Sequence, residues 1–238
     1  DSLKLGFGDR VATLAWNGYR HLELYFGVSG SGRVLHTLNP RLPPDQVVWI
    51  ANHAEDKVLC FDMTFLPIIQ AVHARCPMIK TYVALCDADK LPADSGIPNL
   101  VSYEAWIAGK SAAYAWPQFD ENSASSMCYT SGTTGRPKGV MITHHNLLIG
   151  AMTFLTDVND VEASDSIFHA APLSHGSGFY DLPYVMRGAN QVIPNSGRFV
   201  PSEVCELLES WQGVSMFLAP TMVKRLAELY QSEKFTTN

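Results

Sequence analysis

One stretch decides the fold of this chain: Met-Cys-Tyr-Thr-Ser-Gly-Thr-Thr-Gly-Arg-Pro-Lys-Gly-Val, at residues 127–140. Its apolar start predicts a buried strand over residues 125–129, and a helix is expected from about His145. In the loop between them, glycines let backbone N–H groups approach an anion, hydroxyls add donors, and Arg136 and Lys138 add positive charge. The loop is not a Walker A motif, because Pro137 precedes the lysine and Gly139 follows it. The stretch therefore predicts a phosphate-binding loop of another kind.

Outward from this loop, short apolar runs alternate with longer helical patterns. Strands are expected over residues 10–16, 33–38, 57–61, 81–86, 125–129, 166–170, 191–193 and 214–218. Helices are expected over residues 19–28, 44–54, 65–75, 103–108, 145–156, 178–187, 201–211 and 222–231. Gly27, Gly109 and Gly188 are expected to end helices in the left-handed conformation. The alternation predicts βαβ units, and hence an α/β fold with a mostly parallel sheet.

Composition excludes several classes of function. The 238 residues carry a formal net charge of −6, which argues against nucleic acid or an anionic membrane surface as the main partner. No apolar run approaches the roughly 20 residues that a membrane-spanning helix needs. The five cysteines are widely spaced, which suits free thiols in a reducing compartment. A cytoplasmic protein without a transmembrane segment is expected, with small molecules as its partners.

Residues 129–140 resemble the signature loop of the adenylate-forming enzymes, which include acyl-CoA synthetases, peptide-synthetase adenylation domains and luciferases. Two further stretches agree with this resemblance. His-Thr-Leu-Asn-Pro-Arg-Leu at residues 36–42 is similar to the fatty acyl-CoA synthetase branch, and Ala-Pro-Leu-Ser-His-Gly at residues 171–176 is similar to a later motif that lines the acyl pocket. Residues 8–134 most resemble medium- and long-chain acyl-CoA ligases, including methylmercaptopropionate–CoA ligases.

The resemblance implies a two-step reaction. ATP with Mg²⁺ activates a carboxylate to an acyl-adenylate and pyrophosphate, and coenzyme A then takes the acyl group. Lys138 is the implied catalytic residue of the loop, and the hydroxyl of Thr133 is implied to contact Mg²⁺. The groups implied to bind the ATP phosphates are Thr130, Ser131, Gly132, Thr133, Thr134, Gly135 and Lys138.

His175 is the second candidate catalytic residue. It follows an expected strand and a tight Ala-Pro-Leu-Ser turn, so it is expected at the carboxyl edge of a sheet, where open α/β folds bind ligands. The resemblance implies that it lines the acyl site near the reacting carboxylate. The alternative is a histidine on a surface turn.

The resemblance also implies that the chain is part of a larger enzyme. Residues 1–160 would form a first βαβ sub-domain, residues 161–238 would begin a second, and the C-terminal small domain with its catalytic lysine would be absent. Surfaces that normally face the missing parts of the enzyme would then be exposed, which predicts self-association or poor solubility. Two alternatives to a fatty-acid ligase remain: a ligase for another acid, such as methylmercaptopropionate or an aromatic acid, and a non-catalytic nucleotide-binding module.

Overall fold

The computed structural model of this chain describes residues 3–130 and 136–232, and their contacts separate two units. Unit 1 holds the residues up to Ala15 together with Arg20–His145. Unit 2 holds Trp16–Tyr19 and the residues that follow His145. The sub-domain boundary expected near residue 160 remains a prediction.

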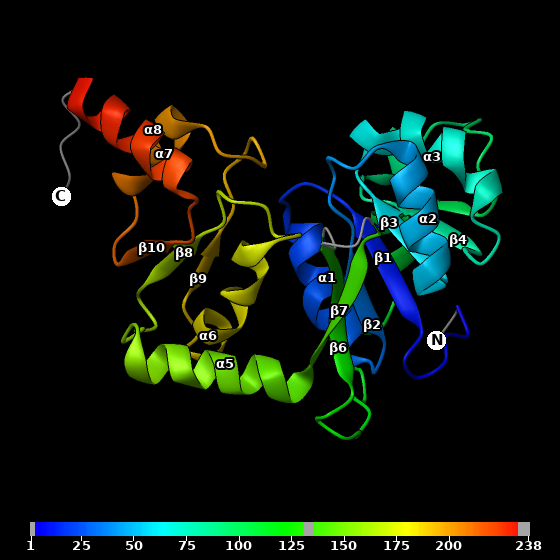
Figure 1. The fold of residues 1–238 in the computed structure, drawn as a ribbon, viewed down its shortest axis with the longest axis horizontal. Helices are drawn as coiled ribbons and strands as arrows, with labels where there is room; N and C mark the ends of the chain where they lie inside the picture. Colours follow the sequence, from blue (N-terminus) through cyan, green and yellow to red (C-terminus); the bar gives the residue numbers. More distant parts are fainter. Residues whose placement is uncertain (1–2, 131–135, 233–238) are drawn as a thin grey trace. The chain divides into compact units, whose positions relative to one another are not determined.

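A seven-stranded sheet forms the centre of unit 1, in the order β5-β4-β3-β1-β2-β6-β7 (Figure 1). All neighbouring strands are parallel except β6 and β7, which are antiparallel. The strands are β1 (Arg10–Leu14), β2 (Val34–Thr37), β3 (Val58–Phe61), β4 (Thr81–Ala84), β5 (Leu100–Ser102), β6 (Ala124–Thr130) and β7 (Lys138–Thr143). The helices are α1 (Tyr19–Gly30), α2 (Pro44–Ala54), α3 (Leu66–Val72) and α4 (Tyr103–Ile107), with 3₁₀ turns at Met63–Phe65, His73–Arg75 and Ala88–Lys90.

Two helices cover opposite faces of this sheet, because successive side chains of a strand point to opposite sides. On β2, Leu35 belongs to the cluster that contains Leu24 and Val28 of α1. Its neighbour Val34 instead packs with Ala54 at the end of α2. Accordingly, α1 and α2 lie on either side of β1 (Figure 1). By the same alternation, His36 points to the α2 face.

Unit 2 contains a parallel three-stranded sheet in the order β10-β8-β9. Its strands are β8 (Ser166–Phe168), β9 (Asn190–Val192) and β10 (Val214–Met216). Its helices are α6 (Asp181–Met186), α7 (Pro201–Leu208) and α8 (Pro220–Ser232), with a 3₁₀ turn at Gly176–Phe179; α5 (His144–Asp157) begins at the end of unit 1. Ile167 of β8 and Tyr184 of α6 pack together in its core.

The structure confirms the α/β class and the mostly parallel sheet. It differs from the sequence prediction in several details, one of which is β5 (Leu100–Ser102), a strand that was not expected. Lys138–Thr143 is a strand, β7, although the sequence analysis assigned its first residues to the loop. Gly27 does not end α1, which continues to Gly30, whereas Gly109 and Gly188 do have positive φ angles of 70° and 69°. In the part of the chain that is described, no helix has the length and apolar character needed to cross a membrane.

Candidate functional site

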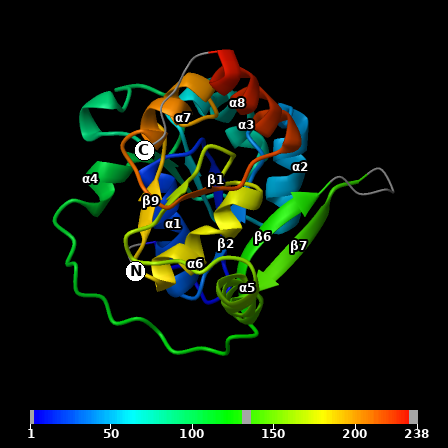
Figure 2. The same ribbon diagram turned by 90° about the vertical axis from the view of Figure 1, so that its left-hand side faces the viewer.

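The predicted phosphate loop is carried by the β6–β7 hairpin of unit 1. Figure 2 shows the two strands side by side and running in opposite directions. Thr130 pairs with Lys138, so these two exposed residues form the base of the loop. The other predicted phosphate ligands, Ser131, Gly132, Thr133, Thr134 and Gly135, lie outside the described residues, and their roles remain predictions.

Gly139 has a packing role in this hairpin. It lies opposite Tyr129, and a Cβ atom added to it would come 3.2 Å from Cζ of the Tyr129 ring and 3.4 Å from Sδ of Met127. A larger residue would therefore press on Tyr129, as contacts this short are tight for a Cβ atom. From the sequence, the glycines of this stretch were expected to let backbone N–H groups approach an anion, whereas Gly139 is required by packing against Tyr129.

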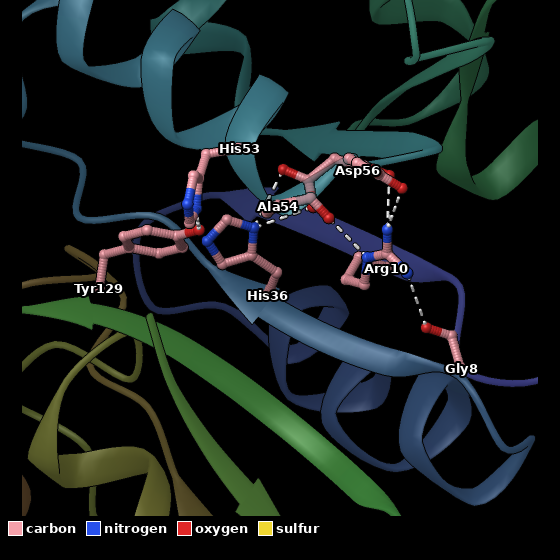
Figure 3. A network of polar contacts seen from close by, with 8 residues as sticks. Gly8, Arg10, His36, His53, Ala54, Asp56 and Tyr129 are labelled. Carbon is pink, nitrogen blue, oxygen red and sulfur yellow. Dashed lines mark hydrogen bonds and ion pairs between the residues drawn. The ribbon is translucent and has the colours of Figure 1, made fainter. Parts of the chain in front are cut away.

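Tyr129 is held on its other side by helix α2. Its hydroxyl lies 2.6 Å from Nδ1 of His53, within hydrogen-bonding distance (Figure 3). His53 is stacked on Trp49, with ring centroids 4.8 Å apart, and Trp49 meets Tyr129 edge-on at 6.2 Å. Trp49 and His53 are four residues apart and share one helix face. Burial, and to a smaller extent the charge of Asp56, raises the pKa of Tyr129.

A buried pair of ionisable groups lies beside Tyr129. Nδ1 of His36 is 2.9 Å from both carboxylate oxygens of Asp56, and both side chains are fully buried. Because a carboxylate only accepts hydrogen bonds, Nδ1 carries the proton and donates. Burial raises the pKa of Asp56, and the charge and hydrogen bond of His36 oppose that rise. The His36 ring centroid is 5.3 Å from that of Tyr129 (Figure 3).

Arg10 fixes the turn that carries Asp56. Its Nε donates to the carbonyl of Ala54 at 2.5 Å, and one terminal nitrogen is 3.0 Å from Oε2 of Glu55. Glu55 itself ends α2 in the left-handed conformation, with φ 55°, where glycine is the usual residue. A positive side chain at the carboxyl end of a helix also complements its dipole. The turn is thus held by side-chain contacts despite its unfavourable backbone angle.

His175 stands in unit 2, seven residues beyond the end of β8. It is exposed, it precedes the 3₁₀ turn Gly176–Phe179, and its Nδ1 accepts a hydrogen bond from the backbone N–H of Gly176 at 2.7 Å. In the neutral ring this contact leaves the proton on Nε2. The geometry permits a role toward a ligand and equally permits a surface turn, so the acyl-site role remains a prediction.

The residue that holds this turn was not predicted from the sequence. Asn17, in the short segment that belongs to unit 2, donates through Nδ2 to the carbonyls of His169 (2.6 Å) and Ala171 (2.8 Å). Its Oδ1 accepts from the backbone N–H of Leu173 at 2.8 Å. Asn17 is more than 150 residues away in sequence, so no local signal connects it to the motif.

His36, Asp56 and His53 were missed for a similar reason, although a weak signal existed. A histidine inside an otherwise apolar strand, and an aspartate where a helix gives way to the next strand, are unusual at buried positions. The sequence does not reveal that these two meet. Among residues 3–130 and 136–232, no group of three histidine, cysteine, aspartate or glutamate side chains could hold a metal ion.

A family model described as AMP-binding enzyme matches residues 1–238. The chain belongs to this AMP-binding enzyme family. A medium-chain-fatty-acid–CoA ligase of Ectopseudomonas oleovorans is 42% identical over 90% of the chain and 39% of its own length. A 3-methylmercaptopropionyl-CoA ligase of Ruegeria pomeroyi is 44% identical over 78% of the chain and 34% of its own length. The chain therefore spans about two fifths, or less, of these relatives.

Solved structures of CoA ligases agree with the fold. The anthranilate CoA ligase AuaEII in complex with anthranoyl-AMP has a TM-score of 0.81 and 25% identity over 93% of this chain and 42% of its own. A long-chain-fatty-acid CoA ligase of Rhodopseudomonas palustris CGA009 has a TM-score of 0.82 over 95% of this chain and 54% of its own. At 22% identity, the second likeness bears on the fold alone.

Proposed function

We propose that this chain forms the phosphate-binding part of an enzyme that activates a carboxylic acid with ATP and transfers the acyl group to coenzyme A. The observation that carries the proposal is the β6–β7 hairpin, which sets Thr130 opposite Lys138 at the base of a loop rich in glycine and hydroxyl groups. Membership of the AMP-binding enzyme family and the names of the relatives support it.

The chemistry explains why such a loop is needed. In the first step a carboxylate oxygen attacks the α-phosphorus of ATP, the bond from that phosphorus to the bridging oxygen breaks, and pyrophosphate leaves. In the second step the thiol of coenzyme A loses its proton to solvent, its sulfur attacks the acyl carbon, the bond from that carbon to the phosphate oxygen breaks, and AMP leaves. Two anions meet in the first step, so the protein must position them and offset their charge.

We assign the charge of Lys138 to the phosphate groups that become pyrophosphate, and His175 to the acyl site. The loop positions 131–135 and Thr130 would supply backbone and hydroxyl donors. Mg²⁺ prefers oxygen ligands, which suits the proposed contact with the hydroxyl of Thr133. Such an ion, when bound, would neutralise further phosphate charge.

The proposed acid is a medium- or long-chain fatty acid, because fatty-acid–CoA ligases are among the relatives. Methylmercaptopropionate and aromatic acids are the competing substrates. We also propose a cytoplasmic location, supported by five free cysteines, four of them buried. Nucleic acid is not a proposed partner, because the net charge is −6.

Carboxylate-dependent exchange of label between pyrophosphate and ATP tests the proposal. It is measured on this chain, and on a chimera in which the chain replaces the matching segment of the Ectopseudomonas oleovorans ligase. Fatty acids of several lengths, methylmercaptopropionate and anthranilate are compared. An acid-dependent signal in the chimera identifies the substrate class. Nucleotide binding without exchange for any acid in either protein would favour a non-catalytic nucleotide-binding module.

Lys138→Ala is expected to reduce exchange in the chimera by about 100-fold or more, the usual scale for one preorganised charge-stabilising group. Lys110→Ala is the matched control, because Lys110 is an exposed lysine of the same unit outside the hairpin. Equal exchange rates in the two variants would overturn the assignment of Lys138 to the phosphates.

A further inference from the structure

The end of β6 that leads into the loop lacks the pairing with β2 that the middle of the strand has. Pairing between β2 and β6 runs from Leu35↔Ser126 to Thr37↔Cys128. Tyr129 and Thr130 extend beyond it and pair with Gly139 and Lys138 of β7. Since β7 is the edge strand of the described sheet, the base of the loop needs another anchor.

The side chain of Tyr129 supplies this anchor. Its ring meets Trp49 edge-on. Its hydroxyl lies 2.6 Å from Nδ1 of His53, and the ring packs against the His36 ring (Figure 3). Gly139, opposite Tyr129 on β7, leaves room for the ring. Tyr129 thus joins helix α2 to both strands of the hairpin.

The buried His36–Asp56 pair fixes the orientation of the His36 ring, which packs against Tyr129. His36 bonds Asp56 through Nδ1, while Nε2 is buried without a hydrogen-bond partner among the described residues. Asp56 therefore determines the orientation of the ring that packs on Tyr129. A buried pair of ionisable groups is often no more stabilising than apolar residues of similar size, so stability alone is a weak reason for the His36–Asp56 pair.

We propose that Tyr129 is a positioning residue for the phosphate loop, held in place by His53 and by the buried His36–Asp56 pair. This inference rests on the proposed function insofar as the loop binds phosphate. The anchoring of the hairpin does not depend on it, so the two are tested separately.

Hydrogen exchange of backbone amides tests the anchoring on the chain as it stands. Tyr129→Phe removes only the hydroxyl. Amide exchange in Thr130 and Lys138–Met141 is expected to become about three- to tenfold faster, because the loss of one hydrogen bond makes local opening of the hairpin easier by about that factor. Amides of β3 and β4 should keep their wild-type rates, whereas a general loss of stability would accelerate them as well. Tyr114→Phe is the matched control, since Tyr114 is half exposed in the same unit and meets the Trp116 ring edge-on.

Two double-mutant cycles test the remaining contacts. His53→Phe combined with Tyr129→Phe should add nothing to the single variants, because each change removes the same hydrogen bond. Asp56→Asn preserves the shape but removes the charge, and it should accelerate hairpin exchange in wild type yet not in a Tyr129→Leu background. Wild-type exchange rates in Tyr129→Phe and in His53→Phe would overturn the proposal, as would acceleration by Asp56→Asn that is equal in both backgrounds.

Binding of inorganic pyrophosphate, measured by calorimetry, links the anchor to the loop. The dissociation constant is expected to rise about three- to tenfold in Tyr129→Phe and to stay unchanged in Tyr114→Phe. If wild type binds neither pyrophosphate nor ATP, the proposal that this chain binds phosphate is wrong. The hydrogen-exchange measurements still decide whether Tyr129 anchors the hairpin. If the hairpin exchanges faster but pyrophosphate binds as in wild type, Tyr129 does not position the loop for its ligand.

Discussion

Asp181, the first residue of α6, is a buried ionisable residue of unit 2. Its side chain is buried, and Oδ2 has no hydrogen-bond partner among the described residues. Burial raises the pKa of this carboxyl to about 7 from an ordinary value of 3.8, although backbone hydrogen bonds oppose the rise. The folded state therefore holds a proton at pH values where the unfolded chain has already lost it.

This difference gives the stability of the chain a predictable pH dependence. Between pH 5 and 7 the folded state binds one proton more at Asp181, so the free energy of unfolding falls as pH rises, by about 1.4 kcal/mol per pH unit. Asp181→Asn lacks this titrating group. The free energy of unfolding of the variant minus that of wild type should therefore rise by about 1.4 kcal/mol per pH unit between pH 5 and 7, and become constant above pH 7. Urea unfolding of both proteins at pH 5, 6, 7 and 8 measures the difference. Asp157→Asn, at an exposed position of the same unit, should show no such trend; a pH-independent difference for Asp181→Asn would contradict the prediction.

At the scale of elements, β7 is an edge strand of the described sheet and has exposed apolar side chains. Met141 is 69% exposed and Val140 is 43% exposed. An edge strand of this kind is a template for pairing with another chain. We expect this chain to self-associate through β7, and Met141→Lys to shift the equilibrium toward monomer, because a charge on an edge opposes pairing. Sedimentation velocity over a wide concentration range measures the degree of association. Met78→Lys is the control, because Met78 is an exposed methionine elsewhere in unit 1. Association that is the same in Met141→Lys and wild type would show that β7 is not the contact.

The same strand illustrates what could be predicted from sequence. Alternating strands and helices predicted the parallel sheet, because each pattern reflects local periodicity. Residues 140–143, Val-Met-Ile-Thr, have strand character, but the glycines and Pro137 before them favoured a loop. The partners of Tyr129 could not be predicted, because His53 and His36 approach it only when β2, α2 and β6 have come together. Sequence motifs indicated which loop to examine, and the long-range contacts that hold it came from the fold.

For the molecule as a whole, the net charge of −6 opposes the binding of an anion such as ATP. Any affinity must come from local groups, among which Lys138 and Arg136 flank the loop. A ligand that binds only the folded state stabilises it by about 2.7 kcal/mol at about 100 times its dissociation constant.

For a chain of this size that stabilisation corresponds to a rise in melting temperature of roughly 5 to 10 °C. We expect ATP to produce this rise in wild type and in Lys110→Ala, and to produce a smaller one in Lys138→Ala, because Lys138 supplies charge at the base of the loop. Added salt should reduce the effect, since screening weakens contacts between exposed charges. Thermal unfolding with and without ATP, at low and high salt, measures both dependences. A rise that is equal in wild type and Lys138→Ala would place the ATP phosphates away from this hairpin, because the same anion would then be bound without the charge at its base.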